Sequence, residues 1–369
     1  MPKGPLLNYR EDETIQPTTV VVINYNGKQH LEACLRSVQE AEGPIHEVIL
    51  VDDSSTDGSV AFVQEQFPWV KVIRLLENQG PAAARNAGIE AAQTAWVCLL
   101  DNDIVAEKGW LMALGEAMAE SPDPAICSSR ILVYERPGII GSDGNEAHFV
   151  GMPTQRNAGS RASEMLASAP VEVGAIGGAS CLIDKSRIES RPFFDPDFFY
   201  NFEELDFCLR NRMLGYRCLV VPLSIVHHKY LTGGVAGLSA SEVQYSSRRA
   251  FYVFRNRWFI ILKLYALRTL LVIAPALLLF ELVTILFAVR RRVVRPYLQA
   301  WGSVMRNLGP IREKRRAIQT SRVCSDKTLL SAHALTLGRG TTEGTLEARL
   351  VSFLSSIFEA YWRLARCLL

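Results

Sequence analysis

Apolar runs of strand length alternate with helical periodicity along the first 120 residues. Four runs of mostly β-branched and other apolar side chains occupy residues 18–24, 46–52, 70–76 and 95–101. Such uninterrupted runs are typical of parallel strands that are buried on both faces. Between them apolar residues recur every three or four positions, as Leu31, Leu35 and Val38 do, and Pro81 suits a first helical turn. Four strand–helix units in succession predict an α/β fold with a doubly wound, mainly parallel sheet and helices on both faces.

The fourth run ends in two carboxylates, Asp101 and Asp103, separated by one residue. Ligands of open α/β sheets bind at the carboxyl ends of the strands, so both side chains are expected at the mouth of a site. Two hard oxygen ligands there suit Mg²⁺ or Mn²⁺, with phosphate and water completing the coordination. An ordinary turn would use the same residue types. The choice between a metal site and a turn therefore depends on the other motifs of the chain.

A second chemical stretch follows a less informative middle. Residues 138–170, rich in Gly, Ser and Asn, predict a long surface loop that either folds over the ligands of the site or is a plain insertion. Small residues at 174–180 precede a strand, where a backbone must come close to something. Acids then open a helix that ends near Gly215, and His227 and His228 follow a strand at 216–221.

The first βα turn excludes two common nucleotide folds. Neither G-x-G-x-x-G nor G-x-x-x-x-G-K-[ST] follows the first strand, which continues as Asn-Tyr-Asn-Gly-Lys from Asn24. A bound nucleotide must therefore be held by acidic and amide side chains and by a metal.

Four motifs in order give the chain a family resemblance. They are Val-Ile-Asn-Tyr-Asn-Gly at 22–27, Val-Asp-Asp-Ser-Ser-Thr-Asp-Gly at 51–58, Glu-Asn-Gln-Gly at 77–80 with Ala-Ala-Arg-Asn-Ala-Gly at 83–88, and Leu-Asp-Asn-Asp at 100–103. Together they resemble the successive motifs of the family-2 glycosyltransferases of the GT-A fold. The likeness covers about residues 17–232, continues less specifically to 316, and is closest to the branch with bacterial rhamnosyltransferases and related polysaccharide-assembly enzymes.

The resemblance implies a nucleotide-sugar site and inversion at the anomeric carbon. Asp52 is expected near the base, and Asp101 and Asp103 near the ribose, pyrophosphate and a divalent cation. His228, favoured over His227, is the expected third metal ligand. The residues implied to bind the donor are Asn24, Asn26, Asp52, Asn78, Arg85, Asn86, Asp101 and Lys229.

The acids that open the later helix are the expected catalytic group. In the family this segment resembles Glu-Asp-x-Asp-x-x-x-Arg, whose first pair supplies the base, but here Glu204 stands where Asp is usual. A carboxylate within hydrogen-bond reach of the acceptor hydroxyl can take its proton. We assign Glu204 as base, Asp206 as reserve and Glu203 as a binding partner; the alternative is that these acids only complement a helix dipole.

Charge and hydropathy set the C-terminal third apart. Residues 248–316 hold 15 of the 40 Lys and Arg but only two acids, which indicates a basic module facing an anionic partner. Residues 269–289 are apolar except for one charge and would span roughly 31 Å as a helix. Pro275, Glu281 and cations at both ends argue against a single crossing. We therefore expect a kinked, re-entrant or in-plane segment on anionic lipids. A single transmembrane span and a buried core helix are the alternatives. Nucleic acid is not expected as the anionic partner, because the uninterrupted apolar run would not contribute to binding it.

The termini complete the expected domain organisation. Residues 1–16 form a polar extension without the apolar stretch of a secretory signal. The GT-A catalytic domain covers 17–242, and the basic, apolar helical region 243–316. A linker at 317–345 leads to an amphipathic helix at 346–369, for which the membrane, the catalytic domain and a second copy are all suitable partners. Eight scattered cysteines without a C-x-x-C pair favour a reducing compartment.

These observations predict a monotopic or peripheral glycosyltransferase on the cytoplasmic face of a membrane. It would move a sugar from a nucleoside diphosphate to a glycan hydroxyl, on a lipid-linked acceptor, in cell-surface polysaccharide synthesis. A nucleotidyltransferase and a non-catalytic sugar-nucleotide-binding scaffold are the alternatives.

Overall fold

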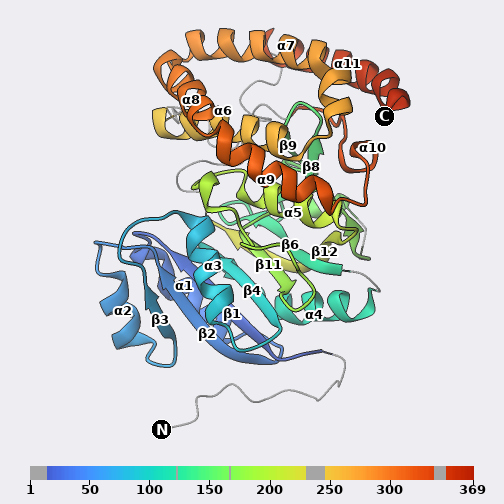
Figure 1. Ribbon diagram of the computed structural model, residues 1–369. Coiled ribbons are helices and arrows are strands. Elements are labelled where there is room, and N and C mark those ends of the chain that lie inside the picture. Colours follow the sequence, from blue (N-terminus) through green and yellow to red (C-terminus); the bar gives the residue numbers. More distant parts are fainter. Residues whose placement is uncertain (1–14, 122–123, 166–167, 230–245, 336–345) are drawn as a thin grey trace.

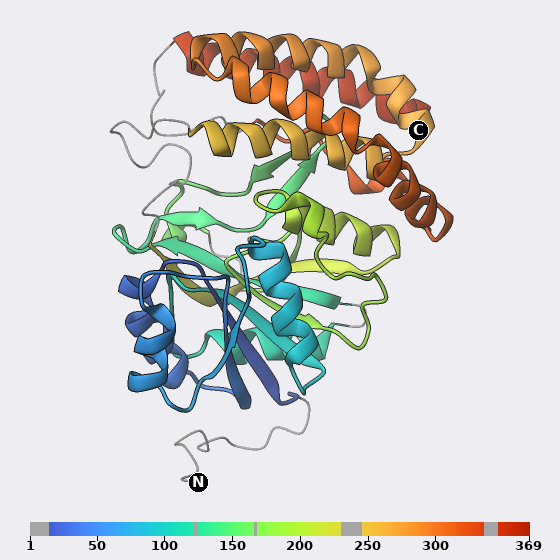
Figure 2. The ribbon, with the colours of Figure 1, turned by 60° about the vertical axis from the view of Figure 1, so that its left-hand side comes forward.

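A mixed sheet with helices on both faces forms the body of the molecule, and the C-terminal helices form a further layer on one side of this body (Figures 1 and 2). The computed structural model describes residues 15–121, 124–165, 168–229, 246–335 and 346–369. The ten-stranded sheet has the order β10-β12-β6-β11-β4-β1-β2-β3, with β5 added to β12 and β7 added to β6. This architecture confirms the α/β fold with helices on both faces.

The four strands predicted from the apolar runs form one half of the sheet. They are β1 (Thr18–Asn24), β2 (Ile45–Asp52), β3 (Lys71–Arg74) and β4 (Trp96–Asp101). All neighbours among them pair in parallel. Every residue of β1 is buried because helices cover both faces, which is why the strand has no alternating polar positions.

The other half of the sheet is mixed, which the strand–helix pattern did not indicate. Its strands are β5 (Ile104–Ala106), β6 (Pro124–Val133), β7 (Ile140–Ser142), β10 (Val171–Glu172), β11 (Ser180–Asp184) and β12 (Arg217–His228). β11 lies antiparallel between β4 and β6. β12 continues past Pro222, where a register irregularity accommodates the proline, and its end pairs with β5 beside Asp103. The histidine pair therefore lies next to the carboxyl end of β4.

Helices cover the two faces of the sheet in separate groups. On one face lie α1 (Lys28–Gln39), α2 (Ser59–Gln66) and α4 (Trp110–Glu120); on the other lie α3 (Pro81–Ala91) and α5 (Glu203–Met213). Alternate side chains of β1 divide between them, because Val20 and Val22 belong to the first core and Val21 and Ile23 to the second.

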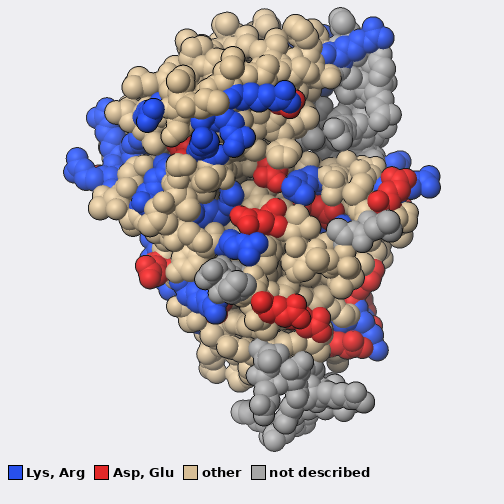
Figure 3. All heavy atoms as spheres, turned by 90° about the vertical axis from the view of Figure 1, so that its right-hand side faces the viewer, with Lys and Arg blue, Asp and Glu red and all other residues tan. Residues whose placement is uncertain are grey.

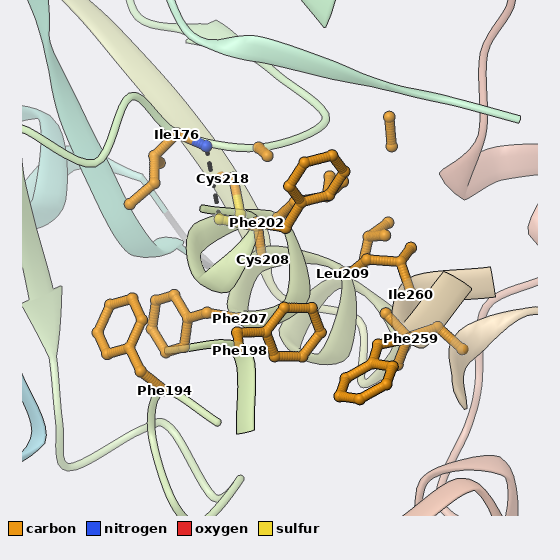
Figure 4. Close-up of a cluster of buried hydrophobic side chains, with 14 of the residues drawn as sticks. Ile176, Phe194, Phe198, Phe202, Phe207, Cys208, Leu209, Cys218, Phe259 and Ile260 are labelled. Carbon is orange, nitrogen blue, oxygen red and sulfur yellow. Dashed lines mark hydrogen bonds between the residues drawn. The ribbon is translucent and has the colours of Figure 1, made fainter. Parts of the chain in front are cut away.

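The C-terminal region extends the core on the side of α3 and α5. It comprises α6 (Ser247–Leu264), α7 (Leu267–Arg290), α8 (Val294–Arg306), α9 (Leu308–Thr320), α10 (Asp326–Leu329), α11 (Leu346–Ala365) and the short 3₁₀ turn η3 (Arg366–Leu368). Phe198 and Phe259 meet edge to face where α6 lies against the segment before α5 (Figure 4). The apolar cluster is continuous from the sheet to α11, so this region is part of the folded body.

Residues 138–170 are not the long loop that their composition predicts. They contain β7, the hairpin of β8 (Asn145–His148) and β9 (Met152–Gln155), and the 3₁₀ turn η1 (Ala162–Glu164). Phe149 and Val150 are fully buried between this hairpin and the C-terminal helices. Strands of three or four residues are too short to give a periodic signal, and only their tertiary partners stabilise them.

The predicted domain boundaries cross secondary structure in the C-terminal region. The boundary at residue 316 falls inside α9, and α10 lies within the predicted linker 317–345. The predicted extension 1–16 is described only for its last two residues, of which Ile15 is buried against the sheet. Residues 336–345 and 1–14 lie outside the described part, and the boundaries stay predictions.

Candidate active site

A cleft opens at the carboxyl ends of β1 and β4 and has a volume of about 870 Å³. The end of β4, the first turn of α5, the start of α3 and the end of β12 all contribute to its wall. Of the predicted residues, the cleft is lined by Asn24, Asn78, Arg85, Asp101, Asp103, Glu203, Glu204 and His228. Glu204, the expected catalytic base, therefore shares one cavity with the expected metal ligand His228 and with Asp101 and Asp103, which precede it by about 100 residues.

Arg85 is buried at this cleft and contacts three of its acids. Its guanidinium lies 3.0 Å from the nearest carboxylate oxygens of Glu203 and Glu204 and 3.2 Å from Asp101. It also donates to the carbonyl oxygen of Gly178, at 3.3 Å. One arginine thus faces three carboxyl groups, and it holds the end of β4, the first turn of α5 and the start of β11 together.

Burial and crowding of like charges raise the pKa values of these acids. Burial raises the pKa of Asp101 to about 6, even though the charge of Arg85 opposes the shift. Burial and the neighbouring Glu204 carboxylate raise the pKa of Glu203 to about 8. Glu203 is thus protonated at neutral pH. Glu204 is the more exposed of the pair, with 22% of its side chain accessible against 4% for Glu203, and it faces the cleft.

Asp103 and His228 meet at the other edge of the cleft. The Oδ2 of Asp103 lies 3.1 Å from the Nε2 of His228, and both side chains are partly exposed. Burial alone would lower the pKa of His228, but the hydrogen bond and negative charge of Asp103 outweigh it and raise that pKa. His227 points elsewhere, to Glu107 at 3.0 Å. Within the described ranges no three Asp, Glu, His or Cys side chains form a ready-made metal site.

The two adjacent aspartates at the end of β2 have different surroundings. Asp52 is buried and accepts hydrogen bonds from the Asn24 side chain (2.8 Å) and the Ser55 amide (2.9 Å), and it does not line the cleft. Asp53 lines the cleft and accepts from the backbone amides of Gln79 and Gly80, both at 2.8 Å. Sequence reasoning selected Asp52 and missed Asp53, although both belong to the motif at 51–58. Only the direction of each side chain distinguishes them.

Four other predicted residues lie outside the cleft lining. Asn26 accepts from the Thr56 amide at 2.8 Å and ties two loops together. Asn86 pairs with the backbone of Phe194 through two hydrogen bonds of 2.7 and 2.8 Å. Asp206 is buried between Arg210 (2.8 Å) and Lys263 (2.6 Å). The Lys229 ammonium lies over the Tyr134 ring, 4.9 Å from its centroid.

The backbone at the glycines before β11 lies close to another element, as the small residues there predict. A Cβ on Gly178 would lie 2.0 Å from the Oε1 of Glu204, so any larger residue would displace that carboxylate. The turn before α5, residues 199–202, also lines the cleft and was not singled out from the sequence.

The comparisons with known proteins agree with this geometry. Residues 19–176 match the family model described as Glycosyl transferase family 2. The succinoglycan biosynthesis protein ExoO of Rhizobium meliloti is 39% identical over 92 residues, 25% of this chain and 26% of that protein. The pre-mycofactocin glycosyltransferase of Mycobacterium tuberculosis is 27% identical over 233 residues, 63% of this chain and 45% of that protein. The chain thus spans less than half the length of these curated relatives.

A solved structure supports the fold. The crystal structure of GalNAc-T7 with UDP, GalNAc and Mn²⁺ superposes with a TM-score of 0.52 and 17% sequence identity, over 70% of this chain and 53% of that one. This likeness concerns the fold alone. Residues 19–176 thus match glycosyltransferase family 2, and the likeness in structure supports the GT-A fold.

Proposed function

We propose that the chain is an inverting glycosyltransferase that moves a sugar from a nucleoside diphosphate to a hydroxyl of a glycan acceptor, held on a lipid. The observation that carries this proposal is the common cleft of Glu204, Asp101, Asp103 and His228. Relatives named for succinoglycan and teichuronic acid biosynthesis support a role in cell-surface polysaccharide assembly. A rhamnosyl donor stays a prediction from the motifs.

Glu204 is the proposed catalytic base. As the acceptor oxygen bonds to the anomeric carbon, its proton passes to the Glu204 carboxylate and the bond from that carbon to the diphosphate breaks. A single displacement from the opposite side inverts the anomeric centre. Glu203 is held protonated beside Arg85, and Asp206 is sequestered by Arg210 and Lys263, so neither competes well for this role.

The residues at the cleft edge fit a divalent cation. Asp103 offers a hard oxygen and His228 a ring nitrogen, 3.1 Å apart and open to the cleft, and diphosphate oxygens and water would complete the shell of Mg²⁺ or Mn²⁺. Asp101, which also lines the cleft, forms an ion pair with Arg85 at 3.2 Å. When bound, the cation would offset the charge that develops on the leaving diphosphate.

Donor turnover tests this function. UDP-, GDP- and dTDP-sugars are first screened by thermal shift with Mg²⁺ and Mn²⁺, because a ligand that binds only the folded protein raises its stability. Release of nucleoside diphosphate from the best donor is then measured for the wild type, Glu204→Gln and Asp103→Asn. We expect losses of roughly 10²- to 10⁴-fold for Glu204→Gln, the usual contribution of a general base.

Three outcomes would contradict the proposal. Equal turnover in all three proteins would remove the roles of both residues. Release of pyrophosphate would indicate a nucleotidyltransferase. Donor binding without any turnover by the wild type would indicate a binding protein, in line with the replacement of the usual Asp by Glu204.

We further propose that the helical layer lies on the cytoplasmic leaflet of a membrane. Among the helices in the described part, α7, with 24 residues, is the one long and apolar enough to cross a membrane, and most of it is not buried inside the protein. Its single acid faces inward, where Glu281 pairs with Arg257 at 2.6 Å and accepts from Tyr297 at 2.8 Å. These contacts support an in-plane helix, because a spanning helix would lose them.

A further inference from the structure

We infer that α6 positions the catalytic base, and that Asn256 is the residue through which it acts. This inference rests on the proposed function, because it concerns the geometry of Glu204. The segment between η2 (Pro196–Phe198) and α5 lines the cleft and leads directly into Glu203 and Glu204. Whatever fixes the backbone of this segment also fixes where the first turn of α5 begins.

The segment has an unfavourable backbone conformation. Phe199, Asn201 and Phe202 have φ angles of 59°, 64° and 73°, and none of them is glycine. Bulky L-residues rarely adopt positive φ, since the Cβ then crowds the backbone. Residues in such conformations persist when the surrounding structure over-determines them. The observed conformation therefore requires partners outside the segment.

Asn256 supplies those partners from the middle of α6. Its side chain is fully buried, and its Nδ2 lies 2.9 Å from the carbonyl oxygens of Phe198 and Tyr200 and 2.7 Å from that of Asn201. One amide group thus gathers three carbonyls of the same turn. An amide side chain can do this because it carries two hydrogens on one nitrogen, one of which is shared.

The neighbouring Arg255 completes the arrangement. Its Nε donates to the Oδ1 of Asn256 at 2.8 Å, which fixes which end of the amide faces the turn. Its guanidinium also donates to the carbonyls of Asp197 (2.6 Å) and Phe198 (2.9 Å). Two consecutive residues of α6 therefore hold four carbonyls of the segment 197–201.

A contact with α3 and further contacts with α6 also constrain the segment. A Cβ on Gly80, at the start of α3, would lie 2.2 Å from the carbonyl oxygen of Phe199. Phe198 is buried below, against Phe259 of α6 (Figure 4). The Phe199 ring stacks on Tyr252, with ring centroids 5.2 Å apart. The turn is thus enclosed between α3 and α6, and loss of the Asn256 hydrogen bonds would release it on one side only.

Asn256 does not line the cleft, and the turn that it holds leads into α5, so we expect its effect on the reaction to pass through Glu204. Among the residues that line the cleft, Asn24, Asp53 and Asp101 come from β1, the residue after β2, and β4. Arg248 and Arg249, at the start of α6, also line it, two turns before Asn256. Removing the amide should therefore lower the rate of transfer and leave nucleotide affinity nearly unchanged.

The test uses the full chain with Asn256→Ala and Asn256→Asp, which replaces the donating amide by an acceptor of similar shape. Tyr265→Phe is the matched control, because it removes a different buried hydrogen bond at the end of α6, from Tyr265 to the His148 carbonyl at 3.2 Å. We expect kcat to fall by roughly 10- to 100-fold in both Asn256 variants, the usual cost of misplacing a reacting group. The affinity for UDP, GDP or dTDP should stay within about twofold, and Tyr265→Phe should keep its kcat.

A double-mutant cycle separates positioning from general destabilisation. If Asn256 acts through Glu204, Asn256→Ala should cause no further loss in a Glu204→Gln background. Multiplicative losses, an unchanged kcat, or an equal fall in nucleotide affinity would overturn the inference while leaving the proposed function intact.

Hydrogen exchange gives a readout that needs no activity. Amides of residues 197–206 should exchange faster in Asn256→Ala than in the wild type and in Tyr265→Phe. If exchange there is unchanged, the hydrogen bonds of Asn256 do not fix the segment 197–201, whatever reaction takes place in the cleft. If exchange rises but the wild type transfers no sugar, the proposed function fails and the structural role of Asn256 stands.

Discussion

The charge balance around Arg85 decides which carboxyl groups can act. One buried guanidinium meets Asp101, Glu203 and Glu204, all within 3.2 Å, so the cluster carries an excess of negative charge if every acid is ionised. Burial, and after it the neighbouring Glu204 carboxylate, raises the pKa of Glu203 to about 8, and protonation of this acid relieves that excess. The exposed member of the pair, Glu204, is then left as the carboxylate that faces the cleft.

This balance predicts how Glu203→Gln changes stability with pH. The folded-state pKa of Glu203 lies above its unfolded value, so the folded protein binds the proton more tightly. This contribution is fully present below the unfolded pKa and is lost as pH rises toward about 8, by at most about 1.4 kcal/mol per pH unit. Glutamine cannot ionise, so the variant should gain stability relative to the wild type from pH 5 to pH 8. Urea unfolding across this range measures the difference, and parallel curves would contradict the assignment.

At the scale of elements, the predicted parts are those with a local signal. β1 has the bounds expected from its apolar run, and α1 buries Leu31, Leu35 and Val38 as their spacing requires. β5 and β7 have three residues each and acquire strand structure only by pairing with β12 and β6. The antiparallel insertion of β11 likewise depends on partners far away in sequence.

The hairpin β8–β9 shows what such distant partners add. His148, at the end of β8, is buried, and its ring lies 6.0 Å from that of Phe358 in α11. The next residue, Phe149, stacks on Trp362 at 5.0 Å. The amphipathic C-terminal helix therefore docks with one face on the folded body.

This docking should weaken in acid. Burial and the nearby charges of His333 and Arg257 lower the pKa of His148 to about 3. The unfolded or undocked state therefore binds the proton first, and stability falls as pH drops below about 6.5, by up to 1.4 kcal/mol per unit. Hydrogen exchange of residues 350–365, corrected for its intrinsic pH dependence, should rise between pH 7 and pH 5. In His148→Asn that rise should be absent; an identical rise would show that another group is responsible.

For the whole molecule, the distribution of apolar and charged surface bears on its proposed orientation at a membrane. α7 and α11 lie side by side at the end farthest from β1, joined by the hydrogen bond from Tyr361 to the Val272 carbonyl at 2.5 Å. Leu271, Leu278 and Leu286 of α7 are each about 70% exposed, while Ile273 is fully buried. Figure 3 shows Lys and Arg gathered beside this end of the molecule and acids mainly on the sheet domain. This arrangement fits an apolar face that enters a lipid layer with cations at its rim.

Substitutions on the outer face of α7 test this orientation. Leu271→Ser, Leu278→Ser and Leu286→Ser together should abolish sedimentation with phosphatidylglycerol vesicles and leave the urea midpoint nearly unchanged, because these side chains are exposed. Ile273→Ala, on the inner face, should instead cost about 2–5 kcal/mol of stability. Vesicle binding by the triple variant at the wild-type level, or resistance of the wild type to carbonate extraction as an integral protein, would contradict an in-plane helix.

The sequence by itself determined the elements whose signals are local: the buried strands, the helices between them, the ordered motifs within the stretch that matches glycosyltransferase family 2, and the long apolar helix. These follow from hydrophobic periodicity and turn chemistry, which act over a few residues. Tertiary structure alone decided which side chains meet. Asp53, the residue after β2, lines the cleft, whereas the side chain of Asp52 accepts hydrogen bonds from Asn24 and Ser55 instead. Asp206 is withdrawn by Lys263, and Asn256 reaches the turn before Glu204 from 52 positions further along the chain, because contacts between distant segments depend on packing, which leaves no local pattern.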